Sequence, residues 1–538
     1  MGDHELHTLD LGRKGPHFTE IEAQQSYNKD VDELARTGKK QVLKRNFGFM
    51  SMLGFSCTLM STWEGILVVF LIGYTNGGPA GLVYGFILTW IGTLSVFTVM
   101  GELASMVPTA GGQYHWVSIL APPFGRNYLS YLTGWLTVAA WQASLTTTGF
   151  FTGTLLQGII VETVPSYVYE RWHGTLLTWA VIFLGLFFNT IVSSSLPKIE
   201  GFVLILHILG FLACLIPLVY LGPHASPSTI FPVFNNGGGW SSVGLSFFVG
   251  LVGNATAFLG TDGAVHMSEE IKDASLVVPR SMVTSIFING ILAFSMLLAV
   301  LFCAGDLSVA AASPTGYPFI EIFAQATGSV AGATVMTAIV TTLAFSAIIA
   351  TLASSARMAW SFSRDRGLPG WQIFKRVDAR TSMPLYAIAL ATTLSCLLVL
   401  INVGSTTAFQ DIISLVLTTL YATYMIPCSL LLWRRIRGDI RPPQENDNHN
   451  SIDGIKNLTW GPWRIPGAWG IANNILAIVY MIILIIFSFF PGATPVTPVT
   501  MNYSVVVTGG VVVFSTVYYF AHARKFYTGP IVEVRLEK

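Results

Sequence analysis

The chain has 538 residues, of which 52% are hydrophobic and only 11% are charged. A soluble domain typically carries about 25% charged residues, so this composition excludes an ordinary soluble protein and indicates an integral membrane protein. A net charge of +1 gives no reason to expect nucleic acid as a partner. The first 40 residues are polar and charged, so we expect a disordered tail there rather than a secretory signal peptide.

Twelve mostly apolar segments recur along the chain, each near the roughly 20 residues that a membrane-spanning helix needs. They cover residues 47–73, 79–100, 127–160, 174–192, 201–221, 243–267, 280–303, 330–362, 384–403, 409–433, 468–490 and 501–522. The five cysteines lie within or beside these segments without the spacing of a metal site, and no cofactor is expected. The sequence therefore predicts an all-α membrane protein with twelve transmembrane helices.

The positions of the basic residues predict the orientation. If both termini are cytoplasmic, all of the 29 Lys and Arg residues except Arg171 fall on the cytoplasmic side. The opposite orientation would violate the positive-inside rule almost completely. An inserted or deleted helix would also disrupt this pattern, so it supports the count of twelve.

Two of the apolar segments carry an acid next to glycine. The first contains "STWEG", with Glu64 followed by Gly65, and the sixth contains "GNATAFLGTDGAVH", with Asp262 between two glycines. An ionisable residue within a membrane usually marks a site or a pathway. Two glycine-interrupted segments in corresponding halves point to the binding site of an inverted-repeat transporter. The alternative is that these glycines serve close helix packing.

Several longer motifs resemble a known family. They are Glu102–Pro122, Leu196–Phe211, Gly260–Met282, Ala353–Gly370, Met501–Ser504 and Tyr527–Pro530. Together they resemble the amino acid–polyamine–organocation superfamily, and most closely its fungal amino acid/choline branch. The resemblance implies a leucine-transporter-type core of two inverted five-helix repeats plus two extra helices. It also implies uptake of choline, GABA or amino acids at the fungal plasma membrane.

The resemblance divides the chain into six parts. They are a cytoplasmic tail (1–45), the first repeat (46–233), the second repeat (234–437), a cytoplasmic loop (438–467), the last two helices (468–523) and a cytoplasmic C-terminal tail (524–538).

The resemblance places the substrate cavity at the two interrupted segments. The implied residues are Thr62, Trp63, Glu64 and Gly65, with Phe258, Gly260, Thr261 and Asp262. Many relatives have small residues where this chain has Trp63 and Glu64. A tryptophan face attracts quaternary ammonium groups, and an adjacent carboxylate supplies the counter-charge. This favours choline first, then GABA or an amino acid. The alternative is that Glu64 pairs inside the protein while Trp63 fills space.

A driving ion and a gate are also implied. His207 matches a position where proton-coupled relatives carry a lysine, and histidine changes charge near physiological pH, so it is the candidate proton site. A histidine bonded to a carbonyl is an equal alternative, and Thr351 as a sodium ligand is a competing idea. By their position at cytoplasmic helix ends, Glu102, Glu269 and Arg364 are the gate candidates, with Glu270 beside Glu269. Asp262 is a second candidate for the gate, with His266 one turn away as its partner.

The sequence thus predicts a secondary active, proton-coupled importer of a small nitrogenous solute. We find no catalytic motif such as Gly-x-Ser-x-Gly, so an enzyme is not expected. A channel does not explain two interrupted, acid-bearing segments. An amino acid or polyamine permease without choline activity, or a nutrient sensor of the same fold that transports little, remains the alternative.

Overall fold

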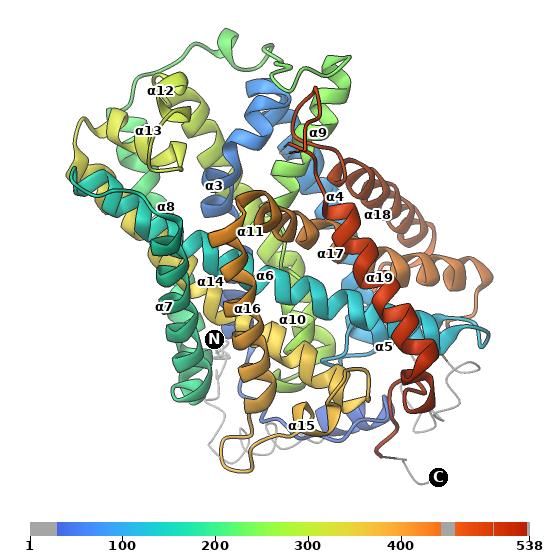
Figure 1. Ribbon diagram of the computed structural model, residues 1–538. Helices are drawn as coiled ribbons and strands as arrows, with labels where there is room; N and C mark the ends of the chain where they lie inside the picture. The colour runs from blue at the N-terminus through green and yellow to red at the C-terminus, as the bar shows by residue number, and fades with distance from the viewer. Residues whose placement is uncertain (1–28, 443–457, 499, 535–538) are drawn as a thin grey trace, which may run out of the picture.

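The computed structural model describes residues 29–442, 458–498 and 500–534. This part of the chain forms a bundle of helices (Figure 1), and its only β-type pairing consists of isolated bridges such as Phe47–Ile271. The prediction of an all-α protein is therefore confirmed.

Every one of the twelve predicted segments is helical. They correspond to α2 (Phe49–Met60) with α3 (Thr62–Thr75), α4 (Gly78–Met106), α6 (Arg126–Thr163), α7 (Arg171–Thr190), α8 (Leu196–Leu221), α9 (Val243–Thr256) with α10 (Gly263–His266), α11 (Ala274–Cys303), α14 (Val330–Arg364), α16 (Leu385–Gly404), α17 (Thr406–Arg437), α18 (Gly467–Ser488) and α19 (Ser504–Ala521). Within the described residues, ten helical stretches are long and apolar enough to cross a membrane, with α2 and α3 taken together. The other two predicted segments are the long α6 and the interrupted α9–α10.

Short helices in the connections were not predicted, because none is long enough to span a bilayer. They are α5 (Gln113–Leu120), α12 (Leu307–Ala311), α13 (Pro318–Thr327) and α15 (Trp371–Phe374). Local signals explain α13, which has proline at its first position and Gly328 in the left-handed conformation at its C-terminal end. In Figure 1, α12 and α13 lie at the upper end of the bundle and α15 at the lower end.

Helix α6 runs through the middle of the bundle (Figure 1) and packs against α7, α14 and α17. Small residues permit this close packing. A Cβ atom added at Gly153 would lie 2.6 Å from the backbone nitrogen of Thr178 on α7. Such contacts fix the central helix against its neighbours and position the residues of the site.

The two ends of the described chain meet at one end of the bundle. The amide of Glu533 donates to the carbonyl of Gly38 at 2.7 Å. Residues 29–36 are helical, and the Lys39 side chain is buried with Asp365 as its partner. The expectation of disorder up to residue 40 is therefore wrong for residues 29–40, because a buried ion pair and backbone hydrogen bonds hold them. Residues 1–28 and 443–457, including half of the predicted cytoplasmic loop, lie outside the described residues. The predicted boundaries of the repeats remain a prediction.

Candidate functional site

Two helices are interrupted where the sequence places glycine beside an acid. Helix α2 ends at Met60 and α3 begins at Thr62, with Ser61 between them at φ 42°. In the second interruption, residues 257–262 separate α9 from α10, and Gly260 adopts φ 98°. Only glycine takes that conformation without strain, which explains the break there. Both interruptions lie beside one cavity.

This central cavity has a volume of about 150 Å³. Its walls include Ser61, Glu64, Gly65, Trp141, Ser144, Thr147, Phe151, Gly260, Ala347 and Thr351. Glu64 is the one charged residue among all its lining residues, which lie in the described part of the chain. The remaining wall is apolar, aromatic or hydroxyl-bearing. Such a cavity suits a small solute that carries a positive charge.

Glu64 belongs to a chain of buried hydrogen bonds. Its Oε1 lies 2.8 Å from Nδ1 of His207 on α8, and Nε2 of His207 lies 2.8 Å from Oδ1 of Asn289 on α11. The Asn289 amide nitrogen in turn donates to the carbonyl of Cys57 at 3.1 Å. Glu64 Oε2 has no hydrogen-bond partner within the described structure.

The orientation of Asn289 defines the proton positions in this chain. Since its nitrogen donates to Cys57, its oxygen faces His207, so Nε2 of His207 must carry a hydrogen. A second proton is then required between Nδ1 and the Glu64 carboxylate. Without that proton, two lone pairs would face each other across 2.8 Å. The Glu64–His207 pair therefore requires a proton in this geometry.

Asp262 lies in a separate polar cluster next to the cavity. Oδ1 accepts from the Tyr424 hydroxyl at 2.6 Å, and Oδ2 accepts from Gln113 at 2.7 Å and from Trp141 at 3.2 Å. Nε2 of His266, its predicted partner, lies 3.5 Å from Oδ2 but makes no hydrogen bond within the described structure. Three donors thus satisfy the carboxylate, and Asp262 joins α10 to α5, α6 and α17 without lining the cavity.

Three of the eight predicted substrate-binding residues line the central cavity, namely Glu64, Gly65 and Gly260. The other five, Thr62, Trp63, Phe258, Thr261 and Asp262, are buried in the protein behind it. The Trp63 ring lies 6.0 Å from both the His207 and the Phe211 ring. The Trp63 ring thus packs against α8, whereas Glu64 lines the cavity.

The aromatic side chains of the cavity are Trp141 and Phe151 from α6. Sequence reasoning missed them, because α6 carries no intramembrane charge to draw attention to it. Asn289 was also missed, although a lone amide within an apolar segment is a usable signal. Thr351 lines the cavity as expected, with its hydroxyl donating to the carbonyl of Ala347 at 2.6 Å.

A second cavity of about 510 Å³ adjoins the first and shares Val69, Thr147, Phe151, Thr256, Leu259 and Val416 with it. It extends to Gly492 and Asn502, in the connection between α18 and α19. That connection lies at the end of the bundle opposite the meeting chain ends. The central cavity therefore adjoins an open space on that side, while the Asp262 cluster lies toward the other.

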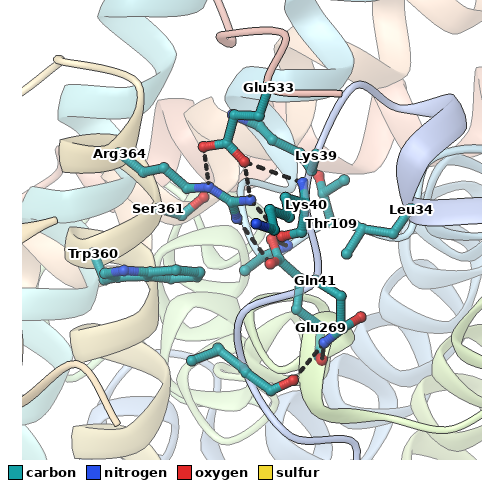
Figure 2. A network of polar contacts seen from close by, with 12 residues as sticks. Leu34, Lys39, Lys40, Gln41, Thr109, Glu269, Trp360, Ser361, Arg364 and Glu533 are labelled. Carbon is teal, nitrogen blue, oxygen red and sulfur yellow. Dashed lines mark hydrogen bonds and ion pairs between the residues drawn. The ribbon is translucent and has the colours of Figure 1, made fainter. Parts of the chain in front are cut away.

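Toward the end where the chain ends meet, ion pairs close the bundle (Figure 2). Arg364, the last residue of α14, donates to Glu269 at 2.9 Å, to the Lys40 carbonyl at 2.7 Å and through Nε to Glu533 at 2.7 Å. Lys39 pairs with the neighbouring Asp365, which also accepts from the Ile531 amide at 2.8 Å. This terminal network joins residues from both ends of the chain to α14.

The predicted gate residues divide into two groups. Glu269 and Arg364 form a direct ion pair, and Glu270 pairs with Arg357 at 2.7 Å. Glu102 does not join Arg364. It faces the end of α17 and pairs with Arg435, while it accepts from the Ile465 amide at 2.7 Å. Glu533 was missed, because 169 residues separate it from Arg364 and no local pattern relates them.

The charge states at this end are fixed by the surroundings. Burial acts to raise the pKa of Glu533, but its hydrogen bonds and ion pair with Arg364 outweigh it and hold the pKa below its usual value. Burial, together with Lys39, lowers the pKa of His115 to about 3. His115 is thus neutral at physiological pH and adds no charge to the terminal network. No group of three or more His, Cys, Asp or Glu in the described chain is arranged to hold a metal ion.

Comparison with known proteins identifies the relatives. The profile of the amino acid permease family matches residues 47–511. The chain belongs to this family. This permease is 30% identical over 454 residues to a putative amino acid/polyamine transporter of Macrophomina phaseolina, covering 84% of the chain and 96% of the relative. It is also 30% identical over 485 residues to the choline transporter of Saccharomyces cerevisiae, covering 90% of the chain and 82% of that protein.

A third relative is the amino-acid permease BAT1 of Arabidopsis thaliana, 28% identical over 522 residues, which cover 93% of the chain and 96% of BAT1. These relatives are named transporters and permeases rather than enzymes. The permease is accordingly an integral, multi-pass membrane transporter, as its apolar helices also indicate. The predicted resemblance to the amino acid–polyamine–organocation superfamily is confirmed.

Proposed function

We propose that this permease imports a small amine together with a proton, with choline as the leading substrate and GABA or an amino acid next. The observation that carries this proposal is the placement of Glu64. It is the one charged residue lining the central cavity, and its Oε2 has no partner while Oε1 contacts His207. A buried carboxylate with an oxygen to spare favours a cation beside it.

The aromatic walls support a quaternary ammonium group. Trp141 and Phe151 line the same cavity as Glu64, and an aromatic face within about 6 Å attracts such a cation. The aromatic face beside the Glu64 carboxylate therefore comes from α6 and not from Trp63. The similarity to the yeast choline transporter agrees with this assignment, while the likeness to amino-acid permeases supports the second choice.

Proton coupling follows from the shared carboxylate. A proton on His207 holds Oε1 of Glu64 in place and leaves Oε2 for the amine, so each cation stabilises the geometry that receives the other. Loss of the proton would leave the lone pairs of His207 Nδ1 and Glu64 Oε1 facing each other, and their repulsion would displace the carboxylate. Proton and substrate would therefore load together from the side on which the cavities open.

We place that side of the protein outside the cell. The distribution of Lys and Arg favours cytoplasmic termini, which puts the 510 Å³ cavity outside and the terminal network inside. The network and the Glu102–Arg435 pair then serve as the cytoplasmic gate, which must release for the substrate to leave. The family resemblance favours the plasma membrane.

The test is uptake of radiolabelled choline at external pH 5 and 7.5 in yeast that lacks its own transporter, with GABA, ethanolamine and amino acids as competitors. We expect saturable uptake that is stronger at pH 5 and falls by about 100-fold in Glu64→Gln, because truncating a buried charge partner costs several kcal/mol. Glu170→Gln, an exposed acid at the start of α7, is the matched control and should transport normally. Uptake of an amino acid without choline would select the second candidate.

Undiminished choline uptake in Glu64→Gln would refute the cation site. A cell-surface protein that transports none of these compounds would instead favour the nutrient sensor.

A further inference from the structure

Glu200 is a buried acid that the proposed transport site does not use. It lies near the start of α8, its side chain is 2% exposed, and its Oε2 has no hydrogen-bond partner. It forms no ion pair with any residue in the described ranges. Burying an isolated carboxylate is very costly, so the protonated form is favoured at this position.

Glu200 and His207 lie on the same face of α8. Seven residues correspond to almost two helical turns, or about 10 Å along the axis. Leu204 lies between them on that face and packs with Leu53, Cys57 and the partly buried Ile288 in a small apolar cluster. This cluster separates Glu200 from the Glu64–His207 pair in the present conformation.

On its other side Glu200 is close to an open hollow. Lys198 and Gly201, which flank it in sequence, line a hollow of about 930 Å³ together with Ser51, Asn46 and Glu270. The hollow lies toward the terminal network, because Glu270 belongs to the loop that carries Glu269. Glu200 thus lies between the Glu64–His207 pair and the space on the cytoplasmic side.

The charged groups near α8 leave Glu200 as the acid best placed on this path. Helix α2, which packs against α8, has no charged residue. The other helices that pack against α8 are α11, α13 and α14, and their charged residues are Arg280, Glu321, Arg357 and Arg364. The charged residues that line the hollow are Lys44, Lys198, Glu270 and Arg380. Arg357 and Arg364 are paired with Glu270 and Glu269. Cys57 is the titratable side chain of α2, and it lies in the apolar cluster.

We propose that Glu200 passes the transported proton from the Glu64–His207 pair to the cytoplasm, which rests on the proton coupling proposed above. When the cytoplasmic side opens, the Glu200 carboxyl releases its proton to water in the hollow. The same opening must part the Leu53–Cys57–Leu204 cluster so that water joins the two sites. The Glu200 carboxylate then accepts, through that water, the proton held between His207 Nδ1 and Glu64, and Glu200 is neutral again. One proton moves from the pair to the cytoplasm in each cycle. Chains of acids and histidines carry protons in this way through membrane transporters.

The experiment compares two modes of transport by the full-length protein in liposomes. The label is choline, or the compound that the uptake screen identifies. Net uptake driven by a pH gradient requires proton release in every cycle, whereas exchange of labelled for unlabelled substrate at equal pH does not. The variants are Glu200→Gln, which keeps the shape of the side chain, and Glu200→Asp, which keeps the acid. Glu170→Gln is the control.

We expect Glu200→Gln to reduce gradient-driven uptake by roughly 10-fold or more, as for loss of a proton-transfer group, while exchange stays within about two-fold of wild type. Glu200→Asp should restore a large part of the driven uptake. Equal loss of uptake and exchange in both variants would show a structural role and overturn the proposal, as would normal driven uptake in Glu200→Gln. A wild-type protein that ignores the pH gradient would instead refute the proton coupling on which the proposal rests.

Discussion

The Glu64–His207 pair and the terminal network are both buried ionic contacts, but they differ in whether every charged group has a hydrogen-bond partner. In the network, Arg364 is met by Glu269, Glu533 and a backbone carbonyl, so its donors find partners within the protein. In the pair, Oε2 of Glu64 has no partner, and Glu64 is one of the residues that line a cavity. Arg364, where the bundle closes, is therefore fully held by the protein. Glu64, at the proposed ligand site, keeps one oxygen without a partner.

The largest expected effect tests whether the network holds the bundle closed. Arg364→Gln leaves Glu269 and Glu533 without their cation, and removing one partner of a buried pair costs about 3 kcal/mol or more. We expect a markedly lower thermal unfolding temperature in detergent and loss of concentrative uptake. Arg376→Gln, which replaces an exposed arginine twelve positions later, should change neither. A normal unfolding temperature for Arg364→Gln would show that the terminal network does not hold the bundle closed.

An intermediate effect tests which aromatic residues contact the substrate in the central cavity beside Glu64. Phe151→Leu removes an aromatic face from the cavity, and we expect the KM for choline to rise about five-fold with kcat unchanged, as befits a lost cation–π contact. Trp63→Phe should leave the KM within about two-fold of wild type, because Trp63 does not line the cavity. A larger rise in KM for Trp63→Phe would instead support the prediction from the sequence that Trp63 contacts the substrate.

The smallest effect separates the two regions by their response to pH. The lowered pKa of Glu533 means that its ionised form stabilises the folded state. That stabilisation is fully present above the pKa of about 4.3 expected for an unfolded glutamate, and it is lost only as the pH falls through the lower folded value. Glu533→Gln should therefore cost about 1 kcal/mol, equally at pH 5 and pH 8. Thermal unfolding across this range measures it.

The pH dependence of uptake between pH 5 and 7.5 should then be the same in Glu533→Gln as in wild type. A changed dependence would mean that the terminal network, and not the Glu64–His207 pair, senses the proton.

Much of the fold could be predicted from the sequence because hydropathy alone locates helices in a membrane. The breaks at Ser61 and Gly260 were also predictable, since glycine beside an acid is unusual in an apolar segment. The direction of side chains at those breaks was not predictable. Trp63 and Glu64 are neighbours, but Glu64 lines the cavity and Trp63 does not. The hydrogen-bond donors to Asp262 come from α5, α6 and α17.

Long-range pairing was equally hidden. Glu102 meets Arg435 and Glu533 meets Arg364, across 333 and 169 residues respectively. Charge positions showed which side of the membrane these residues share, but they gave no information on the partner.

The meeting of the chain ends has a consequence for biosynthesis. Ile531 and Glu533 bind Asp365 and Arg364, and the Glu533 amide also binds the carbonyl of Gly38. These contacts involve residues that follow α19, so they form only after all the described helices have been synthesised. A nascent chain with these helices inserted would still hold Arg364 without one of its carboxylates until residue 533 is added. A chain truncated before residue 533 would lack the same contact, which gives the cell's quality-control machinery a physical mark of a truncated protein.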